Sequence, residues 1–178
     1  MRFADVNAPA APAAPASTDQ RVPTGAMRRT IARRLTQSVQ TAPQFTVTME
    51  LDMSAAKDLR AMLAGRGRKV AFHDIVTLCV CRAVANWPLV NALYGEEEIT
   101  LFGDVNMGVA VGLEDGLVVP VVKGANHLSL AELAAESRRV IALAREGKLT
   151  PGDLAGGTMT LSNLGMYGVR RFDAILNP

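Results

Sequence analysis

The sequence has 178 residues, a mass of 18.9 kDa and a formal net charge of +2, with 49% hydrophobic and 4% aromatic residues. This length is enough for one domain that folds without metals or disulfides. The balanced charge and the scarcity of aromatic side chains argue against a nucleic-acid-binding protein, which usually carries a marked basic excess. No apolar run approaches the ~20 residues of a membrane span, so we expect no membrane partner.

The N-terminal stretch 1–22 differs in composition from the rest of the chain. Within it, residues 8–16 read APAAPAAPA. A proline at every third position blocks helix formation and favours extended, semi-stiff geometry. A disordered tail is one interpretation, but the regular spacing favours a linker between domains. We therefore expect a linker over 1–22 and a folded domain over 23–178.

The first half of that domain begins with a predicted helix over 27–40, which carries Ile31, Leu35 and Val39 on one apolar stripe. Residues 45–52 then alternate strictly between apolar and polar side chains, which predicts a half-buried strand. Further helices are expected over 54–64 and, with a wider apolar surface and a deep position, over 72–86, with a basic loop at 65–69 between them.

The second half begins with a short predicted strand over 99–101. Residues 105–111 alternate, Glu114–Gly116 supply a turn, and 117–122 return, which predicts a hairpin. Pro120 indicates that the return strand is an edge strand or is bulged. A capping box at Ser129 and Glu132 opens another helix, with Gly147 at its end. A final strand over 158–162 completes an α/β two-layer sandwich of helices over an antiparallel or mixed sheet.

Few residues point to chemistry by themselves. Cys79 and Cys81 are two apart in one predicted helix, so their side chains diverge, and we expect reduced thiols in a cytoplasmic protein. His73 reads as an N-terminal helix residue or a partly buried ring, and His127 as a solvated loop residue. Because these histidines have no metal-ligand spacing, we expect no metal.

Ser162 ends the last predicted strand and enters a loop that contains glycines, where its hydroxyl can approach a ligand. A serine followed by Asn163 is also an ordinary turn opener. Without a neighbouring histidine the hydroxyl is a weak nucleophile, but a hydrogen-bond donor to an oxyanion needs no base.

Four arginines lie on the polar side of the first predicted helix: Arg28, Arg29, Arg33 and Arg34. A solvated helix face is the default interpretation. The alternative is recognition of a phosphate-rich ligand, because guanidinium groups bind phosphate through two parallel hydrogen bonds.

Several longer motifs follow one another in a fixed order: MRRTIARRL at 27–35, TAPQFTVTMELDM at 41–53, NMGVAVGLEDGLVVPVVKGA at 106–125, and REGKL followed by GGTMTLSNLGM at 145–166. Together these motifs resemble the dihydrolipoamide acyltransferases, the catalytic cores of the 2-oxoacid dehydrogenase complexes. The resemblance covers about residues 23–178. It implies the chloramphenicol acetyltransferase-like fold of CoA-dependent acyltransferases, and homotrimers that assemble into a larger cubic or dodecahedral core.

The resemblance also implies an activity, the transfer of an acetyl group between a dihydrolipoyl arm and coenzyme A. By its match to the family's TxSN loop, Ser162 is the oxyanion donor. Contacts with substrate or coenzyme A are implied for Val119, Pro120, Val121, Asn163, Gly165 and Arg28. Coenzyme A is then a substrate, lipoate is carried on a separate domain or chain, and no metal is needed.

The SNLGM loop most resembles the acetyl-transferring members, which indicates a pyruvate or acetoin dehydrogenase complex. The implied partners are the 2-oxoacid decarboxylase and dihydrolipoamide dehydrogenase subunits, reached through upstream domains that we expect this sequence to lack.

The sequence departs from the family pattern at three places. The family's catalytic histidine lies in an HxxxDG motif beyond the INP motif, and this sequence ends at Ile175–Pro178. We therefore expect a fold that is incomplete at the C-terminus and lacks the general base. Gln44 stands where the family usually has histidine, and His73 where it usually has asparagine.

These departures leave three hypotheses. The first is an acyltransferase core subunit. The second is a non-catalytic scaffold subunit that assembles with full-length acyltransferase chains. The third, which the Ala/Pro-rich linker and the SNLGM loop argue against, is a free-standing acyltransferase for a small hydroxyl or amine acceptor.

Overall fold

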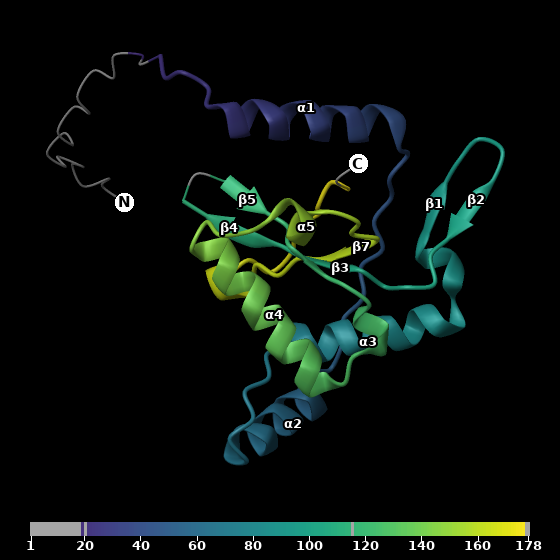
Figure 1. Ribbon diagram of the computed structural model, residues 1–178, viewed down its shortest axis with the longest axis vertical. Coiled ribbons are helices and arrows are strands. Elements are labelled where there is room, and N and C mark those ends of the chain that lie inside the picture. Colours follow the sequence, from purple (N-terminus) through teal and green to yellow (C-terminus); the bar gives the residue numbers. More distant parts are fainter. Residues whose placement is uncertain (1–18, 20, 115, 177–178) are drawn as a thin grey trace, which may run out of the picture.

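The computed structural model describes residues 19, 21–114 and 116–176 (Figure 1). Three features of the sequence lie outside the described residues. They are the Ala/Pro-rich stretch with nearly all of the predicted linker 1–22, Asp115 of the predicted turn, and Asn177 and Pro178 of the final motif.

Four long helices lie where the apolar spacing predicts them, within one or two residues at each end. They are α1 (Ala26–Thr41), α2 (Ser54–Gly65), α3 (Phe72–Asn86) and α4 (Leu130–Arg145). A short α5 (Pro151–Leu154) and the 3₁₀ turns η1 (Pro88–Val90), η2 (Ala125–His127) and η3 (Gly165–Tyr167) connect other elements.

The capping box predicted for α4 is confirmed. The backbone N–H of Glu132 donates to the Ser129 hydroxyl at 3.3 Å, and the Glu132 carboxylate accepts from the Ser129 N–H at 2.8 Å. These two bonds satisfy N–H groups that have no partner inside the helix. Hydrogen bonds that the Glu132 carboxylate accepts from the Ser129 hydroxyl and from the Ser129 N–H hold the pKa of Glu132 below its usual value. Gly147, with φ of 66°, takes the left-handed conformation that commonly follows a helix end.

In the part of the chain that the structure describes, the strands form three small sheets. The central sheet has the order β6 (Val121–Val122), β3 (Met107–Val109), β7 (Met159–Leu161), with β3 antiparallel to β6 and parallel to β7. Strands β4 (Val111–Leu113) and β5 (Gly116–Val118) form the predicted hairpin, and β1 (Ala92–Tyr94) pairs with β2 (Ile99–Leu101).

The return strand of the hairpin is interrupted at Pro120, as its sequence predicts. Strand β5 ends at Val118 and β6 begins at Val121, at the edge of the central sheet. Pro120 has no N–H to donate, but its carbonyl accepts from the Val109 N–H at 2.8 Å. The chain therefore passes from one sheet to the other at the proline.

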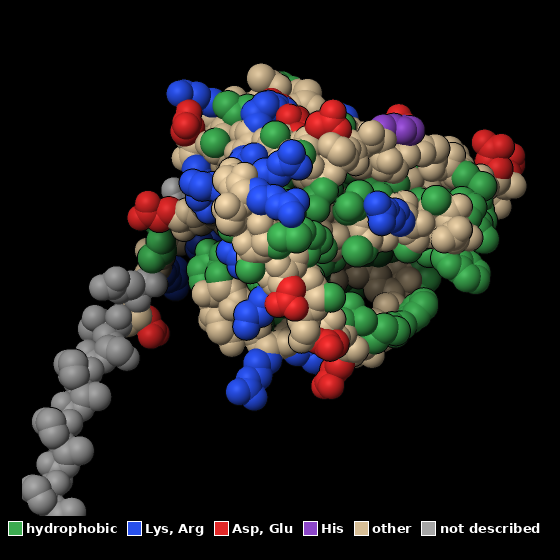
Figure 2. Space-filling view, turned by 90° about the horizontal axis from the view of Figure 1, so that it is seen from below, with side chains coloured by type: hydrophobic (Ala, Val, Ile, Leu, Met, Phe, Trp, Pro, Cys, Tyr) green, Lys and Arg blue, Asp and Glu red, His purple; other side chains and the backbone are tan. Residues whose placement is uncertain are grey.

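The predicted strand over 45–52 is wrong. Within the described part of the chain this segment pairs with no strand, although its apolar side chains alternate. Phe45 is 90% exposed and Leu51 70% exposed. The alternation specifies one apolar face, but a strand also needs a hydrogen-bonded neighbour, and none lies beside this segment. Figure 2 shows hydrophobic side chains gathered around a hollow on the face that it displays.

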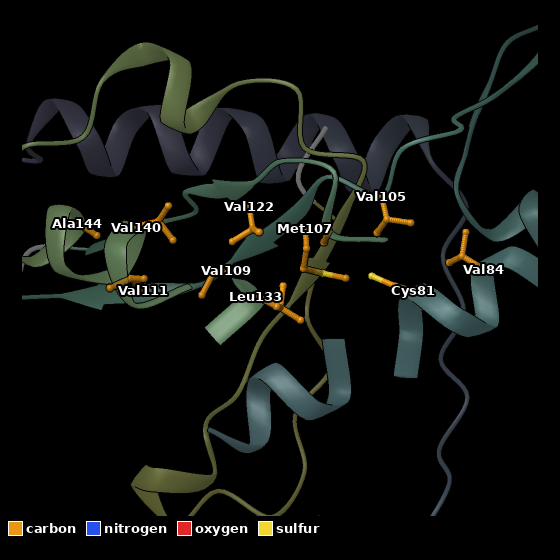
Figure 3. Packing of buried hydrophobic residues seen from close by; sticks show 11 residues of the cluster. Cys81, Val84, Val105, Met107, Val109, Val111, Val122, Leu133, Val140 and Ala144 are labelled. Carbon is orange, nitrogen blue, oxygen red and sulfur yellow. The ribbon is translucent and has the colours of Figure 1, made fainter. Parts of the chain in front are cut away.

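The core lies between the central sheet and helices α3 and α4 (Figures 1 and 3). Met107 of β3 points toward Cys81 of α3, and Leu133 of α4 lies beside them (Figure 3). Helix α1 lies on the opposite side of the strands (Figure 1). The structure thus has the mixed sheet and the covering helices that the sequence predicts. The deep position predicted for α3 holds for one face only, because Cys79 is exposed.

Candidate functional site

A cavity of about 390 Å³ lies between the start of α3 and the carboxyl end of β7. Its wall is mostly apolar, with three polar side chains. The lining residues are Met53, Phe72, His73, Val76, Leu161, Ser162 and Asn163. A small, largely apolar cavity with a few polar groups is the usual form of a small-molecule site.

Ser162 reaches this cavity because β7 ends one residue earlier. The Ala110 N–H donates to the Leu161 carbonyl at 3.3 Å, which ties the end of β7 to the chain that follows β3. Ser162 is half-buried and follows directly. The neighbouring Asn163 accepts a hydrogen bond from the Gly165 N–H at its Oδ1, at 2.8 Å. This turn fixes the backbone on the far side of the serine.

His73 enters the same cavity from α3. The ring is half-buried, and its Nε2 atom is shielded from solvent without a hydrogen-bond partner among the described residues. Burial lowers the pKa of His73 from 6.5, and the weaker attraction of Asp74 does not reverse this. The imidazole is therefore neutral at neutral pH. The Asp74 carboxylate is engaged elsewhere, since it accepts from the Ala71 N–H at 2.8 Å.

This arrangement can support addition to a carbonyl group. The Ser162 hydroxyl is a hydrogen-bond donor for a developing oxyanion, which needs no base. The neutral His73 ring offers both an accepting and a donating nitrogen. The remaining wall, from Met53, Phe72, Val76 and Leu161, is apolar, and an apolar setting strengthens the hydrogen bonds made in it.

Of the other residues implied for substrate or coenzyme A contact, only Asn163 lines this cavity. Pro120 and Val121 are buried in the central sheet, and a Cβ at Gly108 would lie 2.8 Å from Val119 Cγ1. Gly165 is exposed in the loop after Asn163. The contacts of these residues with coenzyme A stay a prediction.

Arg28 is exposed on α1, together with Arg29, Arg33 and Arg34. The N-terminal half of α1 rests on the β4–β5 hairpin, because a Cβ at Gly116 would lie 2.7 Å from Met27 Sδ. The exposed arginine face agrees with the default interpretation of this cluster. Recognition of a phosphate-rich ligand by Arg28 stays a prediction.

His127 lies away from the cavity. It is exposed, as predicted, and its Nε2 lies 2.8 Å from an Asp104 carboxylate oxygen, a pairing that local spacing did not suggest. Cys79 and Cys81 are both free thiols, and burial raises the pKa of Cys81. Over residues 19, 21–114 and 116–176, no group of three or more His, Cys, Asp or Glu side chains could hold a metal, and no helix could cross a membrane.

Residues 16–178 match the family described as 2-oxoacid dehydrogenases acyltransferase (catalytic domain). The chain belongs to this family. Among its curated relatives, a dihydrolipoyllysine-residue acetyltransferase component of the pyruvate dehydrogenase complex from Rickettsia conorii is 38% identical over 88% of the chain. A succinyltransferase component of the 2-oxoglutarate dehydrogenase complex from Bartonella vinsonii is 42% identical over 89% of it. The chain spans 39% and 40% of these relatives' lengths.

Solved structures of the family have the same fold. A probable dihydrolipoamide acetyltransferase from Listeria monocytogenes superimposes with a TM-score of 0.83 at 26% identity, over 89% of this chain and 70% of that one. A truncated catalytic core of the 2-oxoacid dehydrogenase complex from Thermoplasma acidophilum gives 0.84 at 30% identity, over 89% and 75%. The predicted CoA-dependent acyltransferase fold is confirmed.

The member of the cavity that the sequence did not reveal is His73. The sequence predicted a helix-start residue or a partly buried ring at this position, but not a place in the same cavity as Ser162. The two residues belong to elements with the whole central sheet between them in sequence. A histidine at the family's usual asparagine position was the only signal that could have marked it.

Proposed function

We propose that residues 23–178 are an acyltransferase catalytic domain that moves an acetyl group between a dihydrolipoyl arm and coenzyme A, in a pyruvate or acetoin dehydrogenase-type complex. Residues 1–22 are its linker in this proposal. The observation that carries it is the position of Ser162 in a small, mostly apolar cavity at the end of β7. Membership of the acyltransferase family supports the reaction class.

The proposed reaction is a thioester exchange. The thiol sulfur of one substrate attacks the acetyl carbonyl of the other, so a new C–S bond forms and the carbonyl oxygen becomes an oxyanion. The Ser162 hydroxyl donates a hydrogen bond to that oxyanion. When the intermediate collapses, the original C–S bond breaks and the departing sulfur takes up the proton that the attacking thiol released. One thioester and one thiol are present before and after.

The chemistry of the cavity wall favours an acetyl over a succinyl group. None of its seven lining residues is a lysine or an arginine. A succinyl group would bring a carboxylate that needs a cationic partner when it leaves water. An acetyl group brings only a methyl, which suits Val76 and Leu161. Relatives of both kinds resemble this chain, so the choice rests on the wall.

Assembly is the second part of the proposal. Exposed apolar side chains occur along 45–51 and on the β1–β2 strands, at Leu93, Tyr94, Ile99 and Leu101. Such surfaces favour burial against other subunits. We infer a homotrimer and a larger core. Lipoate is carried on a separate domain or chain, and the complex also contains a 2-oxoacid decarboxylase and dihydrolipoamide dehydrogenase. A non-catalytic scaffold subunit, the alternative, would use the same surfaces without turnover.

The deciding experiment measures acetyl transfer from acetyl-coenzyme A to dihydrolipoamide by the folded chain and by its Ser162→Ala variant. The expected loss in kcat is about 10²–10³-fold, because one oxyanion donor is removed. Thr30→Ala removes an exposed hydroxyl on α1, which contributes no residue to the cavity, and serves as the matched control.

Equal rates for the wild-type and Ser162→Ala chains would overturn the role of Ser162. If the folded chain transfers no acetyl group, alone or mixed with a full-length relative whose own motif serine is alanine, the catalytic proposal fails. Co-purification of the two chains from that mixture would then support the scaffold.

A further inference from the structure

The His73 ring, which lines the same cavity as Ser162, has one nitrogen without a hydrogen-bond partner among the described residues. Its Nε2 is shielded from solvent and has no partner in the described part of the chain. Buried polar atoms in folded proteins are nearly always paired, so one without a partner calls for an explanation. His73 and Ser162 line the same cavity, so the ring that carries this covered nitrogen is part of the cavity wall.

The neighbours of His73 do not supply the missing bond. Asp74 directs its carboxylate to the Ala71 N–H at 2.8 Å. Among the other lining residues only Ser162 and Asn163 are polar, and the Asn163 Oδ1 already accepts from the Gly165 N–H. The remaining four side chains are apolar. The wall therefore contains a neutral imidazole whose Nε2 is covered and has no partner among the described residues, in a mostly apolar setting.

A thiol with an apolar body fits such a wall. A neutral imidazole nitrogen can accept a hydrogen bond from a thiol S–H group. The S–H group is a weak donor that bonds water poorly, and its hydrogen bond to nitrogen is stronger in an apolar setting. The aliphatic chain of a dihydrolipoyl group can lie against Val76, Leu161 and Met53 at the same time. A charged ligand would find no counter-charge here.

We propose that His73 is a ligand-contacting residue of the Ser162 cavity, where Nε2 accepts a hydrogen bond from the thiol of a bound dihydrolipoyl group. The proposal rests on the proposed acyltransferase function. The contact orients the sulfur while the Ser162 hydroxyl faces the acyl carbonyl. Because Nε2 is covered in the unliganded chain, a rotation of the His73 ring that uncovers this nitrogen accompanies binding.

The test follows the His73 ring by NMR in the full chain as dihydrolipoamide is added. The His73 resonances should shift saturably, while those of His127, which is exposed and paired with Asp104, should not. Dihydrolipoamide with both sulfurs methylated retains the apolar body but has no S–H, so it should leave Nε2 of His73 unshifted. An unshifted His73 at saturating dihydrolipoamide would overturn the proposal.

Variants give a second readout through binding affinity. Loss of one hydrogen bond in His73→Phe should weaken dihydrolipoamide binding about tenfold. His73→Asn keeps an accepting oxygen and should recover part of the loss, and His127→Asn is the matched control away from the cavity. Unchanged affinity in a folded His73→Phe would show that the ring is only structural. Should His73→Phe not fold, the wild-type titration still decides.

The two proposals can fail separately. If acetyl transfer is absent but His73 responds to dihydrolipoamide and not to its methylated form, the proposed function fails and the thiol contact remains. If transfer occurs and depends on Ser162 while His73 stays silent, the function remains and the thiol contact is overturned.

Discussion

Two segments with the same apolar alternation have opposite surroundings. In 105–111, Val105, Met107, Val109 and Val111 are at most 6% exposed, whereas in 45–51 the corresponding four side chains are at least 70% exposed. The difference lies in their neighbours. Strand β3 has β6 and β7 beside it and helices α3 and α4 over it, and the earlier segment has no strand beside it in the described structure. Alternation thus determines which side chains share a face, and neighbours determine whether that face is covered.

The largest expected effect comes from a matched pair of leucines. Leu133→Ala should lower the free energy of unfolding by about 2–5 kcal/mol, because it leaves a cavity in the core. Leu51→Ala, at an exposed position, should change it by less than about 0.5 kcal/mol. Urea unfolding of the isolated chain measures both. A Leu51→Ala effect as large as that of Leu133→Ala would show that the segment is covered in solution and would end the comparison.

The next largest effect on stability is expected at Gly108 of β3, within the buried segment 105–111, where neighbouring chain segments come very close. A Cβ at Gly108 would lie 2.8 Å from Val119 Cγ1 and 2.9 Å from Thr160 Oγ1. Gly108→Ala should therefore cost about 1–3 kcal/mol through overpacking. At Gly103 the same Cβ would meet nothing within 4 Å, so Gly103→Ala is the control. Equal thermal shifts in the two variants would contradict the tight packing of β3.

The start of helix α4 is stabilised by a local capping residue, Ser129, and not by the burial of an alternating strand. Ser129→Ala removes the side chain that accepts from the Glu132 N–H and should destabilise the chain by about 1 kcal/mol. Ser129→Asp keeps an accepting oxygen at this position and should retain most of the stability. Denaturant midpoints of the three chains provide the comparison. An Asp variant as unstable as the Ala variant would indicate a different role for the hydroxyl.

The smallest expected effect is a pH dependence of the free energy of unfolding, which comes from the half-buried His73 of α3. The folded pKa of His73 lies below its ordinary 6.5, so both folded and unfolded chains hold this ring neutral above pH 6.5. As the pH falls from 6.5 toward the folded pKa, the unfolded chain binds a proton and the folded chain does not, so stability is lost. The stability difference between wild type and His73→Asn should therefore shift against the wild type on acidification. A pH-independent difference would mean that the ring is hydrated.

The sequence predicted those elements whose determinants lie within a few neighbouring residues. The stripe of Ile31 and Leu35, the Ser129 capping box and the turn before Gly116 each act within a few residues, and the structure has a helix, a cap and a hairpin there. Pro120 likewise marked the break in its strand because it cannot donate to a ladder.

What depends on distant partners was not predictable. Strand β1 carries no alternation and is anchored by the buried Asn91, whose side-chain amide donates to the carbonyls of Phe102 at 3.1 Å and Asp104 at 3.0 Å. Two further features depend on the folded arrangement. No strand pairs with 45–52 in the described structure, and His73 and Ser162 line the same cavity. No spacing along the chain encodes these relations.

The parallel pairing of β7 with β3 has a consequence for the order of folding. The β3–β6 pair closes a short loop, but β7 joins only when residues far along the chain have returned, as the bond from the Asn106 N–H to Thr158 Oγ1 illustrates. Long-range pairings form slowly because a large loop must close first. During synthesis the core of α3, β3, β6 and α4 can assemble before β7 arrives. The wall that bears Ser162 is therefore completed last, and a nascent chain that lacks β7 lacks the cavity at Ser162 as well.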